Sequence, residues 1–188
     1  MAPEPRPMAI RPVLRLGDPR LRQRAEPVPE AWFGGAELAA LIVDLRDTMA
    51  ARNGAGLAAP QIGVPLRVLI AALQANPRYP QAEPFEELVL INPQLEPVGS
   101  TRQRGWEGCL SVPGLRGEVE RWQEIRLHWR DATGEPQQQR AQGFKARVLQ
   151  HECDHLEGVL FPDRLNEPRA FGFIPELEAA GLIPAVPD

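Results

Sequence analysis

The segment Gly143-Phe-Lys-Ala-Arg-Val-Leu-Gln-His-Glu-Cys-Asp-His-Leu156 has the periodicity of an amphipathic helix, and Gly158 follows it at a position typical of a left-handed helix end. Its two histidines, His151 and His155, are four residues apart and share one helix face, so both imidazoles can reach one cation. Glu152 is offset by about 100°, so its carboxylate can approach a metal-bound water without ligating the metal. The segment therefore predicts an activated water beside a base.

The faces of this helix are predicted to differ. Phe144 and Val148 share the face of His151, which places an apolar wall beside the histidines. A separate stripe is expected to face the core: Leu149, Cys153, Leu156 and Leu160. The thiol in this stripe is interpreted as a small buried hydrophobe rather than as a ligand.

A catalytic tetrahedral site needs a third protein ligand and leaves one position open. The candidate is Cys109, in the segment Glu107-Gly-Cys-Leu-Ser-Val-Pro113. A lone cysteine is more often a buried structural residue, but the paired histidines favour a thiolate ligand here. Three sulfur and imidazole ligands with a water form a known kind of catalytic set.

Another informative segment is Gly54-Ala-Gly-Leu-Ala-Ala-Pro-Gln61. It lacks the Lys-Ser/Thr of a phosphate-binding loop, and a helix rather than a strand precedes its glycines, so nucleotide binding is not expected. Closely spaced glycines allow the backbone of an extended ligand to approach. The amide of Gln61 can donate to a negatively charged oxygen.

The rest of the chain predicts an α+β fold. Apolar residues at helical spacing from Leu38 to Met49 predict an N-terminal amphipathic helix that stops at Asn53-Gly54. The other expected elements are strands at 67–71, 87–91, 125–130 and 137–141, a surface loop at 74–85 and a short helix near 176–180. Asn92-Pro93 is expected to end the second strand. Mainly antiparallel strands with helices before and after them indicate the α+β class.

The composition suits one globular domain over residues 1–188, with an extended arm at 1–12 and a tail at 165–188 that wraps the surface. The chain carries 21 Lys+Arg against 25 Asp+Glu, a formal net charge of −4, which argues against a broad basic face for nucleic acid. No stretch approaches the roughly 18–20 apolar residues of a membrane helix. Two cysteines are too few for a disulfide scaffold, and no secretory signal is visible, so a cytoplasmic location is expected.

Three of these segments together resemble the peptide deformylases. Residues 54–61, Glu107-Gly-Cys-Leu-Ser111 and Gln150-His-Glu-Cys-Asp-His-Leu-Glu-Gly158 look like the three signature motifs of that family, in the same order and with matching separations. Weaker similarity extends from Leu14 to Arg164. The resemblance implies antiparallel sheets around a central metal-binding helix. It also implies a metal-dependent amidohydrolase that removes the formyl group from N-formylmethionyl nascent peptides and releases formate.

The resemblance also implies roles for individual residues. The metal ligands would be Cys109, His151 and His155. Fe²⁺ would be the favoured metal, with Zn²⁺, Ni²⁺ or Co²⁺ able to replace it. Glu152 would act as the general acid/base while metal-bound hydroxide attacks the formyl carbon.

The remaining site residues are expected to surround these groups. Gln61 and the backbone N–H of Leu110 would stabilise the negative charge that develops on the formyl oxygen. The expected substrate-binding residues are Ala55, Gly56, Gly108, Arg116, Phe144 and Val148. The first three would pair with the peptide backbone by β-addition. Phe144 and Val148 would form the wall of the methionine pocket, and Arg116 would lie at its mouth.

Several positions depart from the family pattern. Ala55 replaces a bulkier aliphatic residue, and Pro60 lacks an N–H that other members often have. Lys145 and Arg147 occupy helix positions that are apolar in some members. The tail after Arg164 lacks the long basic C-terminal helix of one bacterial subgroup, so the chain is closer to the subgroup that includes organellar enzymes. Docking on the ribosome near the exit tunnel stays open.

Three alternatives stay open. A zinc endopeptidase of the HExxH type would usually take a third histidine or a carboxylate downstream, and no histidine follows His155. A structural metal site in a binding protein would need a fourth protein ligand. The spare candidates are Cys153, on another helix face, and His128, which is expected to face solvent. A paralogue that acts on another N-formyl compound would carry the same residues.

Overall fold

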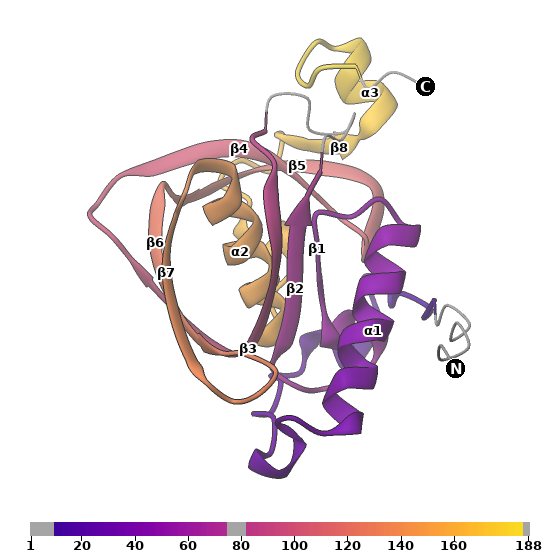
Figure 1. Ribbon diagram of the computed structural model, residues 1–188. Helices are drawn as coiled ribbons and strands as arrows, with labels where there is room; N and C mark the ends of the chain where they lie inside the picture. Colours follow the sequence, from indigo (N-terminus) through magenta and orange to yellow (C-terminus); the bar gives the residue numbers. More distant parts are fainter. Residues whose placement is uncertain (1–9, 75–81, 186–188) are drawn as a thin grey trace.

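The computed structural model describes residues 10–74 and 82–185. These residues form three α-helices and eight strands in two antiparallel sheets. Figure 1 shows how these elements are arranged. The helices are α1 (Ala36–Ala51), α2 (Gly143–Leu156) and α3 (Ile174–Ala179). The strands are β1 (Gly56–Ala58), β2 (Val68–Leu73), β3 (Phe85–Pro97), β4 (Arg102–Cys109), β5 (Val112–Trp122), β6 (Glu124–Arg130), β7 (Pro136–Gln142) and β8 (Phe171–Phe173). The predicted α+β class is confirmed.

The larger sheet has the order β1-β2-β3-β6-β7 and lies between α1 and α2 (Figure 1). Strand β2 is apolar throughout because both of its faces are covered. Val68 and Ile70 pack in the cluster that contains the buried face of α1, whereas Leu69 and Ala71 pack in the cluster that contains α2. The sheet therefore holds α1 and α2 on opposite faces, with β1 at its edge.

Strand β6 confirms the alternating pattern predicted for residues 125–130. Ile125 and Leu127 are buried, and the polar residues between them are more exposed. The turn at 131–134 leads into the edge strand β7, as expected. His128 is half-buried rather than fully exposed to solvent.

The expected end of β3 at Asn92-Pro93 is wrong, because the strand continues through this pair to Pro97. Asn92 has φ 51°, a left-handed conformation that asparagine tolerates, and the pairing with β6 shifts register between Ile91 and Gln94. The Asn92 side-chain oxygen accepts a hydrogen bond from the Val28 N–H at 2.9 Å. The pair therefore forms a bulge within the strand.

The smaller sheet, with the order β4-β5-β8, has no counterpart among the strands predicted from sequence. Strands β4 and β5 form a long hairpin, and the tail contributes β8, which pairs with β5. Strand β4 ends at Cys109. Its end lies over the histidine-bearing face of α2, since the thiol approaches His155. The helix that carries both histidines is thus enclosed by the two sheets.

The predicted helices are confirmed, and α2 has the bounds that its periodicity indicates. Helix α3 begins slightly earlier than expected and buries Leu177. Most of the predicted arm at 1–12 and of the predicted loop at 74–85 lies outside the described residues. Phe85 belongs to β3 rather than to a loop.

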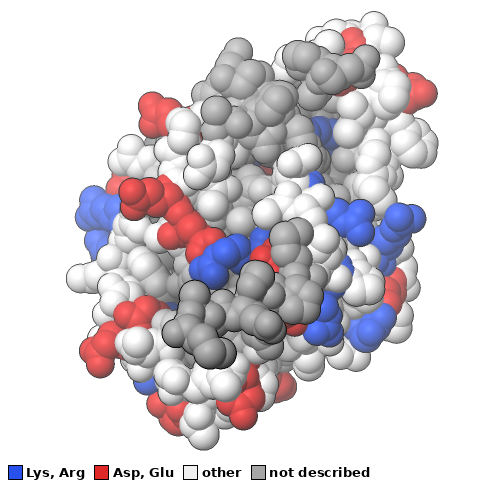
Figure 2. Space-filling view, turned by 45° about the vertical axis from the view of Figure 1, so that its right-hand side comes forward, with Lys and Arg blue, Asp and Glu red and all other residues white. Residues whose placement is uncertain are grey.

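The described surface carries both positively and negatively charged side chains. Lys and Arg lie among Asp and Glu on the face shown in Figure 2. Ion pairs such as Arg46–Glu87 and Arg11–Asp44 link α1 to other parts of the chain. Within residues 10–74 and 82–185, no helix combines the length and the apolar character needed to cross a membrane.

The turn after α2 provides a test of the packing. Gly158 has φ 72°, and a Cβ there would lie 2.5 Å from the carbonyl oxygen of Arg22. Gly99 has nearly the same φ, 73°, with nothing within 4 Å of a Cβ, so it is a matched control. We expect Gly99→Ala to lower the free energy of unfolding by about 1 kcal/mol through the left-handed backbone alone. Gly158→Ala should cost about 2–4 kcal/mol because the contact adds to that strain. Equal losses in urea denaturation would contradict this packing.

Candidate metal centre

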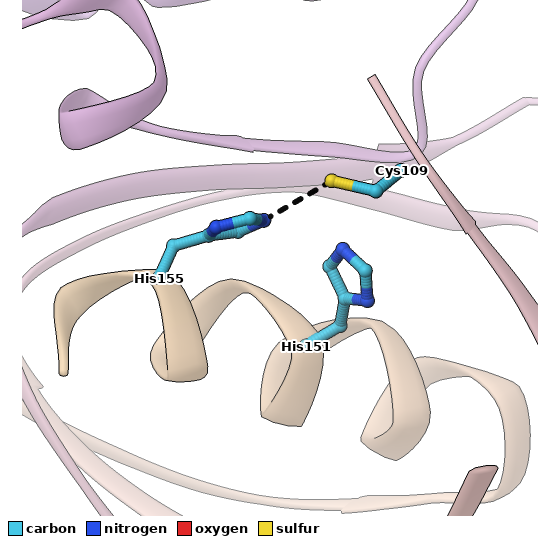
Figure 3. Close-up of side chains that lie close together, drawn as sticks. All are labelled: Cys109, His151 and His155. Atoms are coloured by element: carbon cyan, nitrogen blue, oxygen red, sulfur yellow. Dashed lines mark hydrogen bonds between the residues drawn. The ribbon is translucent and has the colours of Figure 1, made fainter. Parts of the chain in front are cut away.

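Three potential metal ligands converge from α2 and from the end of β4 (Figure 3). The ligand atoms of Cys109, His151 and His155 all lie within 4.8 Å of one another, and all three residues are buried. The Cys109 thiol approaches His155 Nε2 to 3.4 Å. The histidines come together because they are one helical turn apart, with ring centroids separated by 5.1 Å. The predicted combination of a paired-histidine helix and a distant cysteine is therefore present in the fold.

Glu107 orients one of these histidines. Its Oε2 atom lies 2.9 Å from His151 Nδ1. An ionised carboxylate can only accept, so Nδ1 donates, and in the neutral imidazole the lone pair is on Nε2. A carboxylate behind a metal-binding imidazole typically sets its tautomer and its orientation. Nε2 is thus the atom of His151 that is available to a cation.

Glu107 is itself held by two arginines. Arg121 donates to both of its carboxylate oxygens at 2.9 Å, and Arg147 donates to Oε1 at 2.9 Å. Burial opposes the ionisation of Glu107, but the hydrogen bonds from Arg121 and His151 outweigh it and hold the pKa of this carboxyl well below its usual range. The carboxylate of Glu107 therefore stays charged behind His151, a candidate metal ligand.

The two histidines have opposite pKa shifts. Burial alone would lower the pKa of His151, but the neighbouring Cys109 sulfur and the Glu107 carboxylate raise it well above its usual value. Burial and the positive charge of His151 hold the pKa of His155 well below its usual value. The pocket therefore keeps one imidazole neutral and attracts positive charge, both of which suit a bound cation.

Glu152 lies against the edge strand β1 at Gly56, where a Cβ would fall 2.5 Å from its carboxylate. Burial raises the pKa of Glu152 to about 7. Among the described residues, neither Glu152 Oε2 nor His155 Nδ1 has a hydrogen-bond partner, although both atoms are buried. A buried carboxylate oxygen without a partner is costly unless something else binds there.

Gln61 lies in the 3-10 helix Ala59–Ile62, which follows β1, and its amide nitrogen points at the sulfur of Cys109, a candidate ligand. Its Oε1 accepts a hydrogen bond from the Ala58 N–H at 2.9 Å, which fixes the orientation of the amide. The Nε2 atom then donates to Ser111 Oγ at 3.1 Å and lies 3.5 Å from Cys109 Sγ. The donor group of Gln61 therefore faces the metal triad.

A cavity adjoins the triad and contains most of the predicted substrate residues. It is lined by Gly54, Ala55, Gly56, Gln61, Trp106, Glu107, Gly108, Cys109, Leu110, Phe144, Arg147, Val148, His151 and Glu152. Arg116 is not part of this lining. Its side chain is buried, and a Cβ on Gly108 would lie 3.5 Å from its guanidinium carbon. Its place at the pocket mouth stays a prediction.

A larger hollow of about 870 Å³ lies apart from the triad and is lined by five arginines, including Arg121 and Arg164. These arginines are paired with carboxylates, and none of the three triad residues lines this hollow, whereas Cys109 and His151 line the smaller cavity. Cys153 also borders this hollow, and burial raises the pKa of its thiol to about 12. The thiol stays protonated, and Cys153 packs against the apolar core as expected, but it is half-buried rather than fully buried.

Sequence reasoning missed the residues that support the ligands. Glu107 lies within a quoted motif, but its role depends on the pairing of β4 with β5, which the sequence pattern does not indicate. Asp154, between the two histidines, accepts from Arg121 at 2.5 Å and from Arg164 at 2.6 and 2.9 Å. Arg147, which occupies a helix position that is apolar in some family members, is buried here.

The donor set fits a divalent cation. One thiolate and two imidazoles are the ligands that Fe²⁺ and Zn²⁺ accept. No fourth His, Cys, Asp or Glu joins this group in the described chain, which leaves a coordination position open, as catalytic sites require.

The chain matches the family model described as polypeptide deformylase over residues 10–170. It is 53% identical over 177 residues to peptide deformylase 1 of Prochlorococcus marinus, covering 94% of this chain and 91% of that protein. It is also 53% identical over 164 residues to peptide deformylase 1 of Nitrosomonas europaea, covering 87% and 92%.

Solved structures agree. The class I type b peptide deformylase of Acinetobacter baumannii, bound to Met-Ala-Ser, is 40% identical with a TM-score of 0.82, covering 84% of this chain and 99% of that one. The peptide deformylase of Synechococcus elongatus, in complex with actinonin, is 35% identical with a TM-score of 0.76, covering 96% and 91%. The motifs, the geometry and these similarities agree: the chain belongs to the peptide deformylase family.

Proposed function

We propose that this chain removes the formyl group from the N-terminal formyl-methionine of newly synthesised peptides, with Cys109, His151 and His155 as metal ligands. The observation that carries the proposal is the three converging ligand atoms beside a buried carboxylate, Glu152, with one unpartnered oxygen. A divalent cation held there supplies a Lewis acid and lowers the pKa of a bound water. The products are formate and a free amino terminus.

Glu152 is the general acid/base in this proposal. A pKa of about 7 allows the carboxylate to accept a proton from the attacking water and to return it to the leaving amine. Glu152 packs against Gly56, which has no Cβ, so its carboxylate has room beside the edge strand that would pair with the substrate. Hydrolysis of the formyl amide then needs no other titrating side chain.

Gln61 and the backbone N–H of Leu110 stabilise the negative charge on the formyl oxygen. The support for Gln61 is its amide nitrogen, which faces the triad because Ala58 holds the amide oxygen. Leu110 directly follows the ligand Cys109 and lines the same cavity. Donors fixed in advance act most strongly on charge that develops in the transition state.

The peptide backbone pairs with the edge of the larger sheet at Ala55-Gly56 and with Gly108 across the cavity. Strand β1 pairs with β2 on one side and is the edge strand of its sheet among the described residues, so its other side can accept a strand. Phe144 and Val148 form the wall of the methionine pocket. Backbone pairing of this kind distinguishes little beyond the first side chain.

We infer that the native metal is Fe²⁺, with Zn²⁺, Ni²⁺ or Co²⁺ able to replace it, and that the chain acts in the cytoplasm where formylated peptides emerge. The support for iron is the family resemblance together with the thiolate and imidazole ligand set. Anaerobic purification with metal analysis, paired with formate release from formyl-Met-Ala-Ser, tests this assignment. One metal per chain and formate release that falls in air are expected. Formate release that is unaffected by air would contradict iron, and stable metal without formate release would contradict the proposed reaction.

Substitution of Glu152 tests the general acid/base. We expect Glu152→Ala to keep one metal per chain but to lower kcat by at least about 10²–10⁴-fold, because the proton transfers lose their carrier. Glu157→Ala, at the C-cap of α2 with its side chain 40% exposed, is the matched control and should be near normal. Near-normal formate release by metal-loaded Glu152→Ala would overturn the assignment.

Substitution of Gln61 tests the oxyanion donor. We expect Gln61→Leu to lower kcat by about 10²–10³-fold, with a smaller change in KM, since the bond strengthens in the transition state. Ser111→Ala removes the other partner of the same amide nitrogen but keeps the donor, so its loss should be much smaller. Equal losses in the two metal-loaded variants would show that the amide acts only in packing.

A further inference from the structure

Arg147 leaves α2 one turn before His151 and reaches the smaller sheet. Its Nη2 donates to the carbonyl oxygen of Gln103 at 2.6 Å, and its Nη1 donates to that of Val119 at 2.9 Å. Nη1 also lies 3.3 Å from the carbonyl oxygen of Gly105. One guanidinium therefore binds the backbone of β4 and of β5 together.

Strand β4 leaves room for this side chain at Gly105. A Cβ on this residue would lie 3.0 Å from the Arg147 guanidinium carbon and 3.1 Å from its Nε and Nη2 atoms. Such distances are shorter than ordinary packing contacts, so any larger residue would displace the guanidinium or the strand. The glycine and the arginine form a matched pair.

This contact joins the two elements that supply the metal ligands. Helix α2 carries His151 and His155, and β4 ends at Cys109. Arg147 also donates to Glu107 Oε1, while the other oxygen of this carboxylate binds His151. The guanidinium thus contacts β4 before its ligand cysteine and also contacts the carboxylate that orients a ligand histidine.

We propose that Arg147 is a positioning residue that sets the separation between the Cys109 sulfur and the two histidine nitrogens. The inference rests on the metal site of the proposed function. Arg121 binds Glu107 through both oxygens, so the carboxylate keeps a charged partner without Arg147. Loss of Arg147 therefore acts mainly through the placement of β4 against α2.

The shape of the guanidinium is essential to this role. Its planar fork reaches carbonyls on two strands and a carboxylate at once, whereas a lysine ammonium is a compact charge on a flexible stem. Lysine keeps the charge but cannot span these acceptors. Arg147→Lys should therefore fail to restore the site, which separates geometry from charge.

The test uses the metal-free full chain loaded with Co²⁺. Cobalt affinity is measured by competition with a chelator, and the thiolate-to-cobalt absorption reports the Cys109 bond. We expect Arg147→Lys and Arg147→Met each to weaken cobalt binding by about 10–100-fold and to shift the absorption bands. Arg104→Met, on the same strand with its side chain 61% exposed, is the control and should match the unmodified chain.

Gly105→Ala should also displace β4 from α2, and this variant keeps every charged side chain. Gly105→Ala should also weaken cobalt binding, and it can replace Arg147→Met in the test if that variant does not fold. Unchanged affinity and spectrum in Arg147→Lys and Gly105→Ala would overturn the inference, provided that the unmodified chain shows the thiolate band. If the unmodified chain lacks that band, both the proposed metal site and this inference fail.

Discussion

The site depends on one buried carboxylate, Glu107. It accepts hydrogen bonds from His151, Arg121 and Arg147, and its side chain is almost completely enclosed. An ionised carboxylate in such a place costs several kcal/mol unless its oxygens are satisfied. The donors that satisfy it come from β5 and α2, while Glu107 itself lies on β4. The need to satisfy this charge therefore fixes the smaller sheet against the helix, and with it the cysteine against the histidines.

The same requirement explains the other polar residues of α2. The helix is buried on most sides, so each of its polar groups needs a partner. Gln150 exchanges two hydrogen bonds with the backbone of Trp122, at 3.0 and 2.9 Å, and so ties α2 to β5. Asp154 is paired with Arg121 and Arg164. Among the described residues, the buried side-chain atoms left without a partner belong to Glu152 and His155, which lie at the triad where a metal and a substrate would bind.

The sequence predicts the elements whose signal is local. Helix α2 follows from its periodicity and its paired histidines, and β6 follows from the alternation of Ile125 and Leu127. The β4–β5 hairpin could not be predicted in this way, because β4 has several exposed residues and no alternating apolar pattern. The role of Glu107 depends on this hairpin, which brings Arg121 beside it from fourteen residues away. The long β3 was missed because Asn92-Pro93 has the composition of a turn but occupies a bulge.

The central claim is that one cysteine and two histidines hold the metal and leave one position open. X-ray absorption at the zinc edge of the zinc-loaded chain tests it directly, since sulfur and imidazole neighbours scatter differently. The claim predicts one sulfur at about 2.3 Å and three nitrogen or oxygen neighbours at about 2.0–2.1 Å, two of them imidazoles. A shell without sulfur would exclude Cys109. A shell with two sulfurs would bring in Cys153 and would mean a closed, structural site.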